Sequence, residues 1–314
     1  MSFLLPLLSA VIYVAGALFL KRAGELGAGI WRIAWVCNFT AALVFVPMAL
    51  LGGTLRPWHD FWQPAVVALL FVAGQVFTFR SLEVGDISVA TPVLGLKIIL
   101  VGFFTTVLLR DQLTPTLWIA AVLSTAAVAL LNITRGTTHR RIGLTIAMSS
   151  FAAIAYALFD VLVQRWSPSW GIGRFLPVMM AFVALYSLPI CAFSEVRRSN
   201  ASFRPAARWL MAGALCFAVQ SIMFVSTIAL FGEATVANVL YSARGLFSVL
   251  AVWLVGHWFK NREQHLGPRV LTWRLCGAAL LMLAIALVLL GRRSGESHVG
   301  ETQVQHVAFT HPCR

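Results

Sequence analysis

Ten long apolar stretches dominate this chain of 314 residues, and each of them contains at most one Asp, Glu, Lys or Arg side chain. A helix needs about 20 mostly apolar residues to cross a bilayer, whereas isolated strands would leave backbone groups unpaired in lipid. The alternation typical of barrel strands is absent. We therefore predict an all-α integral membrane protein with ten transmembrane helices in a lipid bilayer, at residues 3–20, 30–51, 64–82, 87–109, 115–133, 143–163, 173–193, 209–231, 234–257 and 270–290.

The composition excludes a soluble domain of any size. The chain is 60% hydrophobic and only 11% charged, whereas about a quarter of the residues in an ordinary soluble domain are charged. Its net charge of +13 comes from short basic patches between apolar stretches, so we expect no nucleic-acid partner. Four of the five cysteines fall inside apolar stretches, where we interpret them as packing residues.

The two halves of the chain resemble each other. Residues 85–90 (Gly-Asp-Ile-Ser-Val-Ala) align with residues 232–237 (Gly-Glu-Ala-Thr-Val-Ala) at an offset of 147 residues. Offsets that drift by a few residues are typical of duplicated units with loops of different length. Further pairs follow in the same order at offsets of 142 to 143, namely Tyr13 with Tyr156, Arg22 with Arg165, Arg32 with Arg174, and Pro47 with Pro189.

A duplication of this kind fixes the geometry of the two copies. A unit with five crossings ends on the opposite side of the membrane from its start, so the second copy must insert upside down. We predict two inverted five-helix repeats, residues 1–134 and 143–290, joined by a linker at 135–142. Transporters with inverted repeats rock around a site near the middle of the bilayer. The polar end, residues 291–314, is predicted to be a disordered tail rather than a metal site.

With these features the chain resembles the EamA family of the drug/metabolite transporter superfamily, over residues 3–133 and 143–290. The resemblance implies a ten-helix carrier of a bacterial inner membrane, with a central site lined by helices of both halves and both termini in the cytoplasm. Asp111 stands where the family usually has glutamate, and Trp258 where an acidic residue is expected. The other motifs that carry the resemblance are residues 18–22, Arg32, 81–92, 109–114, Arg174 and 232–237.

Two cations, Lys97 and Arg244, fall near the centres of the fourth and ninth apolar stretches and are repeat equivalents at the same offset of 147. A cation at mid-bilayer costs about 2.5–3.5 kcal/mol on insertion scales, so such residues are functional candidates. No carboxylate is expected at their depth, because Asp160 is placed close to the end of its helix. An anionic group on a substrate would compensate both charges.

A purely structural role is the alternative for these cations. In that interpretation Lys97 is neutral or contacts backbone carbonyls, and Arg244 pairs through water with Asp160 or with an acid at a helix end. The same reasoning disfavours an exporter of lipophilic cations, which would need a buried carboxylate at the depth where this chain has bases.

Other polar residues in the apolar stretches are candidate liners of the same site. Residues three and four apart share a helix face, so Asn238, Tyr241 and Ser248 are expected to form a polar stripe with Arg244. Gln75 and Gln220 lie near the middles of the third and eighth stretches and either line the site or join two helices. The remaining candidates are Thr91, Tyr13, Tyr156 and Asn38.

The function predicted from these patterns is secondary transport of a small metabolite, anionic or zwitterionic, by alternating access. Motifs for an enzyme, a metal or a cofactor are absent, so a membrane-embedded transferase is a weaker alternative, as is a channel or scaffold. Fifteen basic residues against seven would place both termini outside by the positive-inside rule, in conflict with the family expectation. The pattern predicts neither the substrate, the coupling ion nor the oligomeric state.

Overall fold

The structure is a computed structural model that describes residues 3–85, 87–131, 141–193, 204–255, 272–273 and 275–290. Four predictions lie outside these residues: most of the linker at 135–142, Asp86 of the repeated motif, Trp258, and the tail at 291–314. Within the described ranges every regular element is a helix, as the apolar stretches predicted.

Within the part of the chain that the structure describes, eight segments are long and apolar enough to cross a membrane. Two shorter apolar helices, α6 (Pro115–Leu131) and Leu275–Leu290, lie at the fifth and tenth predicted positions. The uninterrupted long helices are α1 (Leu4–Glu25), α3 (Trp62–Val84), α7 (Ile142–Trp170), α8 (Ile172–Phe193) and α9 (Arg204–Phe231). The segment 30–51 consists of α2 (Ile30–Phe45) and the 3₁₀ turn η1 (Val46–Leu51), and a second 3₁₀ turn, η2 (Trp58–Phe61), precedes α3.

The fourth and ninth predicted helices are each broken in the middle, which the apolar pattern did not indicate. The fourth consists of α4 (Ile87–Gly95) and α5 (Lys97–Phe104), followed by the π turn η3 (Thr105–Leu109). The ninth consists of α10 (Ala234–Tyr241) and α11 (Arg244–Val255). The second half-helix therefore begins at Lys97 in one case and at Arg244 in the other. The two breaks are 147 residues apart, which is the offset of the predicted internal repeat.

Helix α7 is longer than predicted, and this corrects the position of Asp160. The apolar stretch seemed to end at residue 163, but the helix continues through Pro168 to Trp170. Membrane helices tolerate proline when neighbouring groups satisfy the freed backbone. Asp160 is thus three turns from the helix end and fully buried, so the expectation that no carboxylate lies at the depth of the cations is wrong.

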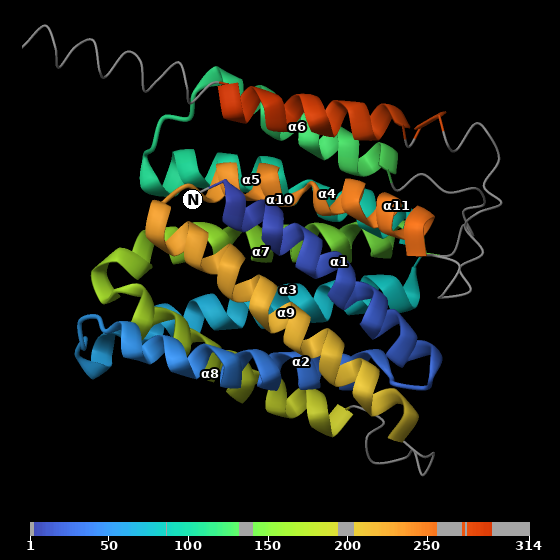
Figure 1. The fold of residues 1–314 in the computed structure, drawn as a ribbon. Helices are drawn as coiled ribbons and strands as arrows, with labels where there is room; N and C mark the ends of the chain where they lie inside the picture. Colours follow the sequence, from blue (N-terminus) through green and yellow to red (C-terminus); the bar gives the residue numbers. More distant parts are fainter. Residues whose placement is uncertain are drawn as a thin grey trace, which may run out of the picture.

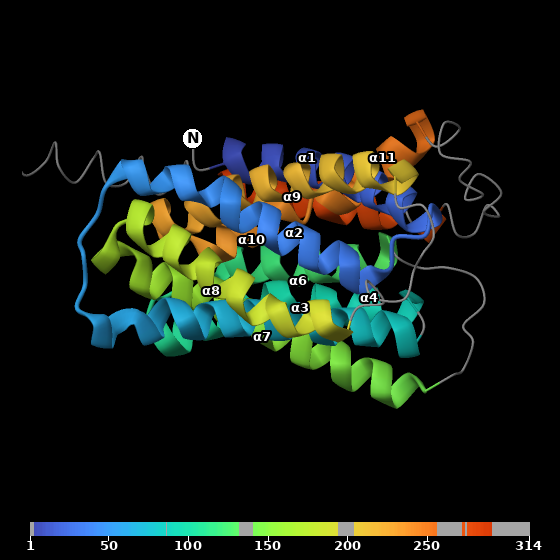
Figure 2. The same cartoon turned by 90° about the horizontal axis from the view of Figure 1, so that it is seen from below.

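The helices pack mainly across the two halves of the chain. Helix α1 runs along α9, α3 runs along α7, and α2 packs against α8, as the two views show (Figures 1 and 2). Small residues permit the close approach of α1 and α9: a Cβ atom on Gly16 would lie 2.7 Å from the Phe217 ring. Helix α6 lies beside Leu275–Leu290, where a Cβ atom on Gly277 would lie 3.0 Å from the Ala127 carbonyl oxygen. The central part of the bundle therefore consists of helices from both halves.

Candidate functional site

Lys97 and Asp160 form an ion pair in the interior of the bundle. Lys97 Nζ lies 2.7 Å from Asp160 Oδ2, and the two side chains are 19% and 1% exposed. The break after α4 places Lys97 in the first turn of α5, which packs against α7, where Asp160 lies. Lys97 thus has a counter-ion within the protein, contrary to the prediction that only a substrate would compensate it.

Asn238 completes the coordination of one oxygen of this carboxylate. Asn238 Nδ2 donates to Asp160 Oδ2 at 2.7 Å and to the Ala234 carbonyl oxygen, one helical turn earlier, at 2.9 Å. The other carboxylate oxygen, Oδ1, is buried and has no hydrogen-bond partner among the described residues. A buried carboxylate oxygen normally has a partner, so Oδ1 is an acceptor available to a ligand or a proton.

Arg244 is held by aromatic rings. Its guanidinium carbon lies 4.7 Å from the centre of the Tyr13 ring and 4.6 Å from that of Tyr241. A guanidinium over a tyrosine face is stabilised by about 0.5–2 kcal/mol, depending on its desolvation. Within the described part of the chain no carboxylate lies within ion-pair distance of Arg244. Asp160, which was one expected partner, is bound by Lys97.

The two cations make equivalent contacts across the two halves. Lys97 Nζ lies 5.8 Å from the centre of the Tyr156 ring, and Arg244 lies over Tyr13. Tyr13 and Tyr156 are predicted repeat equivalents, and each cation contacts the one that lies in the opposite half of the chain. Phe224 contacts both the Lys97 side and the Arg244 side of the cluster, because the centre of its ring lies 5.4 Å from Lys97 Nζ and 4.5 Å from that of the Tyr241 ring. Sequence reasoning placed the cations and tyrosines in one site but missed Phe224.

Gln220 is the other predicted liner that the structure brings to this cluster. Tyr241 Oη donates to Gln220 Oε1 at 3.0 Å, and both side chains are buried. This contact holds the Tyr241 ring between Arg244 and Phe224. Thr91 is partly buried on α4, before the break.

Three other predicted liners have different roles. Asn38 and Gln75 exchange amide hydrogen bonds of 2.7 and 3.2 Å, and Asn38 also donates to Ser187 Oγ at 2.8 Å. This network joins α2, α3 and α8, which is the helix-joining alternative considered for Gln75. Ser248 is exposed and donates to the Gly245 carbonyl oxygen of its own helix, so the prediction that it faces the site is wrong.

The charges of the central cluster do not cancel. Lys97 and Arg244 contribute two positive charges and Asp160 one negative charge, which leaves a formal charge of +1. Lys97 opens α5 and Arg244 opens α11, and the N-terminal end of a helix carries a partial positive charge. The arrangement therefore favours an additional anionic group near Arg244 and the tyrosines.

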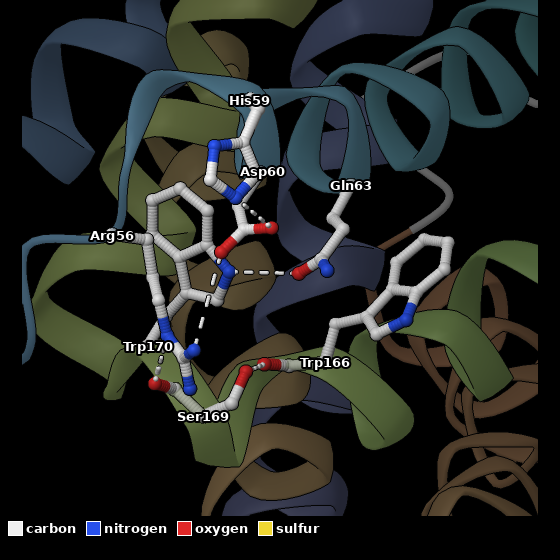
Figure 3. Close-up of polar contacts among 7 residues, drawn as sticks. All are labelled: Arg56, His59, Asp60, Gln63, Trp166, Ser169 and Trp170. Carbon is white, nitrogen blue, oxygen red and sulfur yellow. Dashed lines mark hydrogen bonds and ion pairs between the residues drawn. The ribbon is translucent and has the colours of Figure 1, made fainter.

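A second polar cluster, at the end of the bundle, was missed by sequence reasoning (Figure 3). Arg56 Nε donates to the Ser169 carbonyl oxygen at 3.0 Å, and Trp170 Nε1 donates to Gln63 Oε1 at 2.9 Å. Asp60 lies 4.0 Å from Arg56. Aromatic contacts reinforce these bonds, with ring centres 5.0–5.2 Å apart in the pairs Trp62 with Trp166 and Phe61 with Trp170.

This second cluster ties the α2–α3 connection of the first half to the end of α7 in the second half. The backbone there is too close for larger residues, because a Cβ atom on Gly53 would lie 2.5 Å from the Trp170 carbonyl oxygen. Gly53 also has a φ of 135°, which side chains disfavour. A cavity of about 500 Å³ opens beside it, and its lining includes neither Lys97 nor Arg244. We interpret the cluster as a structural closure of this face.

Comparisons with known proteins agree with the architecture. No curated protein matches the chain. A solved structure, described as a crystal structure of a protein, covers 93% of this chain and 98% of its own, with a TM-score of 0.71 and 18% identity. At that identity the likeness concerns the fold alone. Residues 1–133 match the model of the EamA-like transporter family. This match agrees with the resemblance seen in the sequence over residues 1–133, and with the apolar helices it supports a multi-pass membrane protein.

Proposed function

We propose that this protein is a secondary transporter that moves a small metabolite with an anionic group by alternating access. The carrying observation is the pair of interior cations, Lys97 and Arg244, of which only Lys97 has a carboxylate partner, Asp160, among the described residues. A monoanion at Arg244 would neutralise the remaining charge of +1. We expect the protein in a bacterial inner membrane, as the family resemblance implies.

Arg244 is the principal anion ligand in this proposal. A guanidinium presents a planar fork of donors to a carboxylate or phosphate, and Arg244 has no carboxylate partner in the described chain. Its contacts with the Tyr13 and Tyr241 rings restrict the orientation of the guanidinium plane. Tyr156 and Phe224 supply apolar surface on the side of Lys97 for the uncharged part of the substrate.

The predicted inverted five-helix organisation favours alternating access. The two broken helices occupy equivalent positions, and each cation contacts the tyrosine of the other half. Discontinuous helices near the bilayer midplane frame the substrate in many transporters built from inverted repeats. In this proposal the contacts of Figure 3 hold one face closed and must separate when that face opens.

Binding to the purified protein tests the proposed chemistry before a substrate is known. A panel of small carboxylates, phosphorylated compounds, amino acids and amines is screened by thermal shift. A ligand at 100 times its Kd stabilises the folded state by about 2.7 kcal/mol, which such a screen detects. We expect stabilisation only by compounds that carry an anionic group. Stabilisation by cations alone would overturn the proposal.

Arg244 variants then test the site itself. Arg244→Gln strands no protein carboxylate, so we expect a folded protein that binds the anion about thirty- to several-thousand-fold more weakly, which corresponds to 2–5 kcal/mol. Arg244→Lys keeps the charge but loses the fork and should bind with intermediate affinity. Ser248→Ala, one turn further along α11 and exposed, is the matched control and should bind normally. Unchanged affinity in Arg244→Gln would place the anion elsewhere.

A further inference from the structure

A small polar pocket leads from one face of the bundle toward Asp160. Its volume is about 160 Å³, and it lies between the end of the η3 segment, the start of α6, α7 and the α9–α10 connection. Its outer lining includes the exposed residues Asp111, Gln112 and Thr114. Its inner lining includes Thr105, Gln164 and Thr235, which are buried. The pocket thus connects solvent-accessible polar groups with polar groups in the interior.

Two hydroxyl groups in this pocket point to an occupant. Thr105 and Thr235 are each 2% exposed, and the Oγ1 atoms of both have no hydrogen-bond partner among the described residues. Buried hydroxyls normally have a partner, and a pocket of this size with several polar groups accommodates water. Glu233 lies on the same lining, at the entrance to α10. The pocket therefore has the size and polarity to conduct a proton through water.

The inner end of the pocket is one helical turn from the buried ion pair. Gln164 is four residues after Asp160 on α7, and its Oε1 accepts the Ala234 backbone N–H at 3.0 Å. Asn238 is four residues after Ala234 and binds both the Ala234 carbonyl and Asp160. Polar groups on α7 and α10 thus continue from the pocket to Asp160, whose Oδ1 atom has no partner in the described residues.

Few titratable or charged side chains lie near Asp160. Lys97 on α5 binds it, Tyr156 lies one turn away on α7, and Tyr241 on α10 and Arg244 on α11 complete the cluster. Tyr13 of α1 stacks on Arg244. The charged residues of α3, α8 and α9 occur only near the ends of those helices, and α4 has none. Asp160 is therefore the one carboxylate of the described chain at the depth of the two cations.

We propose that Asp160 is the proton-binding site that couples transport to the proton gradient, and that the pocket of Thr105, Thr235 and Glu233 is its route to solvent. The proposal rests on the proposed function, because it names the ion that moves with the anion. A proton delivered by pocket water forms an O–H bond at Asp160 Oδ1. The carboxylate becomes a neutral acid, and Lys97 loses its counter-ion.

This step changes the charge of the cluster from +1 to +2. An anion then binds more tightly, and by linkage the anion also favours proton uptake, so proton and anion move together. The coupling predicts one proton taken up per anion bound. The apparent Kd for the anion should therefore fall as the pH decreases, by about tenfold per pH unit where one proton is taken up with each anion.

Infrared difference spectroscopy of the purified, ligand-free protein tests the proton site independently of any substrate. On acidification the exposed carboxylates give carbonyl bands of their own, and we expect one further band of a protonated carboxylic acid that is absent in Asp160→Asn and retained in the control Asp60→Asn. Thr235→Val and Thr105→Val should slow the appearance of this band after a pH jump without moving its midpoint, because they change the route and not the acid. Thr40→Val, a buried hydroxyl on α2 outside the pocket, should change neither.

The outcomes separate this inference from the proposed function. The proton site would be overturned if the carbonyl band assigned to Asp160 survived in Asp160→Asn. It would also be overturned if sodium chloride stabilised the folded protein while that band was absent from the wild type. Anions that bind with a pH-independent Kd and no carboxyl band would overturn it as well, while the proposed function would stand. An Asp160 band without binding of any anion from the panel would instead refute the proposed function and leave the proton site in place.

Discussion

Replacement of Lys97 by methionine should destabilise the protein, although it removes a cation from the membrane interior. A cation at mid-bilayer costs about 2.5–3.5 kcal/mol on insertion scales. If no carboxylate lay near Lys97, its removal would therefore stabilise the fold. Because Asp160 Oδ2 lies 2.7 Å from Lys97 Nζ, the substitution instead leaves a buried carboxylate without its counter-ion. The sign of the effect therefore reports whether the ion pair exists.

The magnitude follows from the geometry of the pair. At 2.7 Å and an effective dielectric constant of about 20, the Coulomb attraction is about 6 kcal/mol, most of which offsets the desolvation of the two groups. Removal of one partner of a buried pair costs about 3–5 kcal/mol. Removal of both charges is close to neutral, because no uncompensated charge remains. Lys97→Met combined with Asp160→Asn should thus lie within about 1 kcal/mol of the wild type.

Equilibrium unfolding in mixed micelles gives the four free energies of this double-mutant cycle. The expected coupling is large, since the double variant restores most of the stability that each single variant loses. The exposed pair Arg22 and Glu25, with both side chains 38% exposed, is the control and should couple by less than about 1 kcal/mol. Additive losses at positions 97 and 160, or a Lys97→Met variant more stable than the wild type, would refute the ion pair.

Three further predictions concern other parts of the structure. Asn238→Ala should lower the free energy of unfolding by about 1.5–3 kcal/mol, measured in the same micelles, because it removes a 2.7 Å hydrogen bond to a charged group; equal stability would contradict that bond. Gly74→Leu should displace the Tyr156 ring, because the nearest ring carbons would lie 3.0 Å from the new Cβ atom. This variant should therefore bind the anion more weakly in the thermal-shift assay, whereas Gly24→Leu, with open space around it, should bind normally. Single cysteines near Thr137 and Ser297 should react with impermeant reagents from opposite membrane faces, since five crossings separate them; labelling of both from one face would contradict the inverted repeat.

The sequence predicted the helical architecture well because long apolar stretches leave few alternatives in a bilayer. It also singled out Lys97 and Arg244 as candidates, since cations are rare at such depth, and their equivalence remains a prediction from the offset of the repeated motif. The breaks in the two helices were missed because hydropathy does not change at a break. Pro92 and Gly95 in one stretch and Gly245 in the other were the available signal.

The contacts within the site depended on information that the sequence does not contain. Asp160 was placed near a helix end because the predicted apolar stretch ends at residue 163. The polar residues that follow instead find partners on neighbouring elements: the buried Gln164 accepts the Ala234 N–H, and the exposed Arg165 donates from Nη1 to the Leu108 carbonyl oxygen at 3.3 Å. The pairing of Lys97 with Asp160 is likewise a tertiary contact between distant helices.

Exchange flux in proteoliposomes is the most direct test of alternating access at the cation pair. With an anion identified by the thermal-shift screen, a carrier that alternates around one site takes up labelled anion faster when unlabelled anion is present inside, and the uptake saturates. We expect this acceleration in the wild type and in Ser248→Ala, and its loss in Arg244→Gln although that variant is folded and inserted. Uptake that neither saturates nor responds to internal anion, or that persists unchanged in Arg244→Gln, would contradict the account.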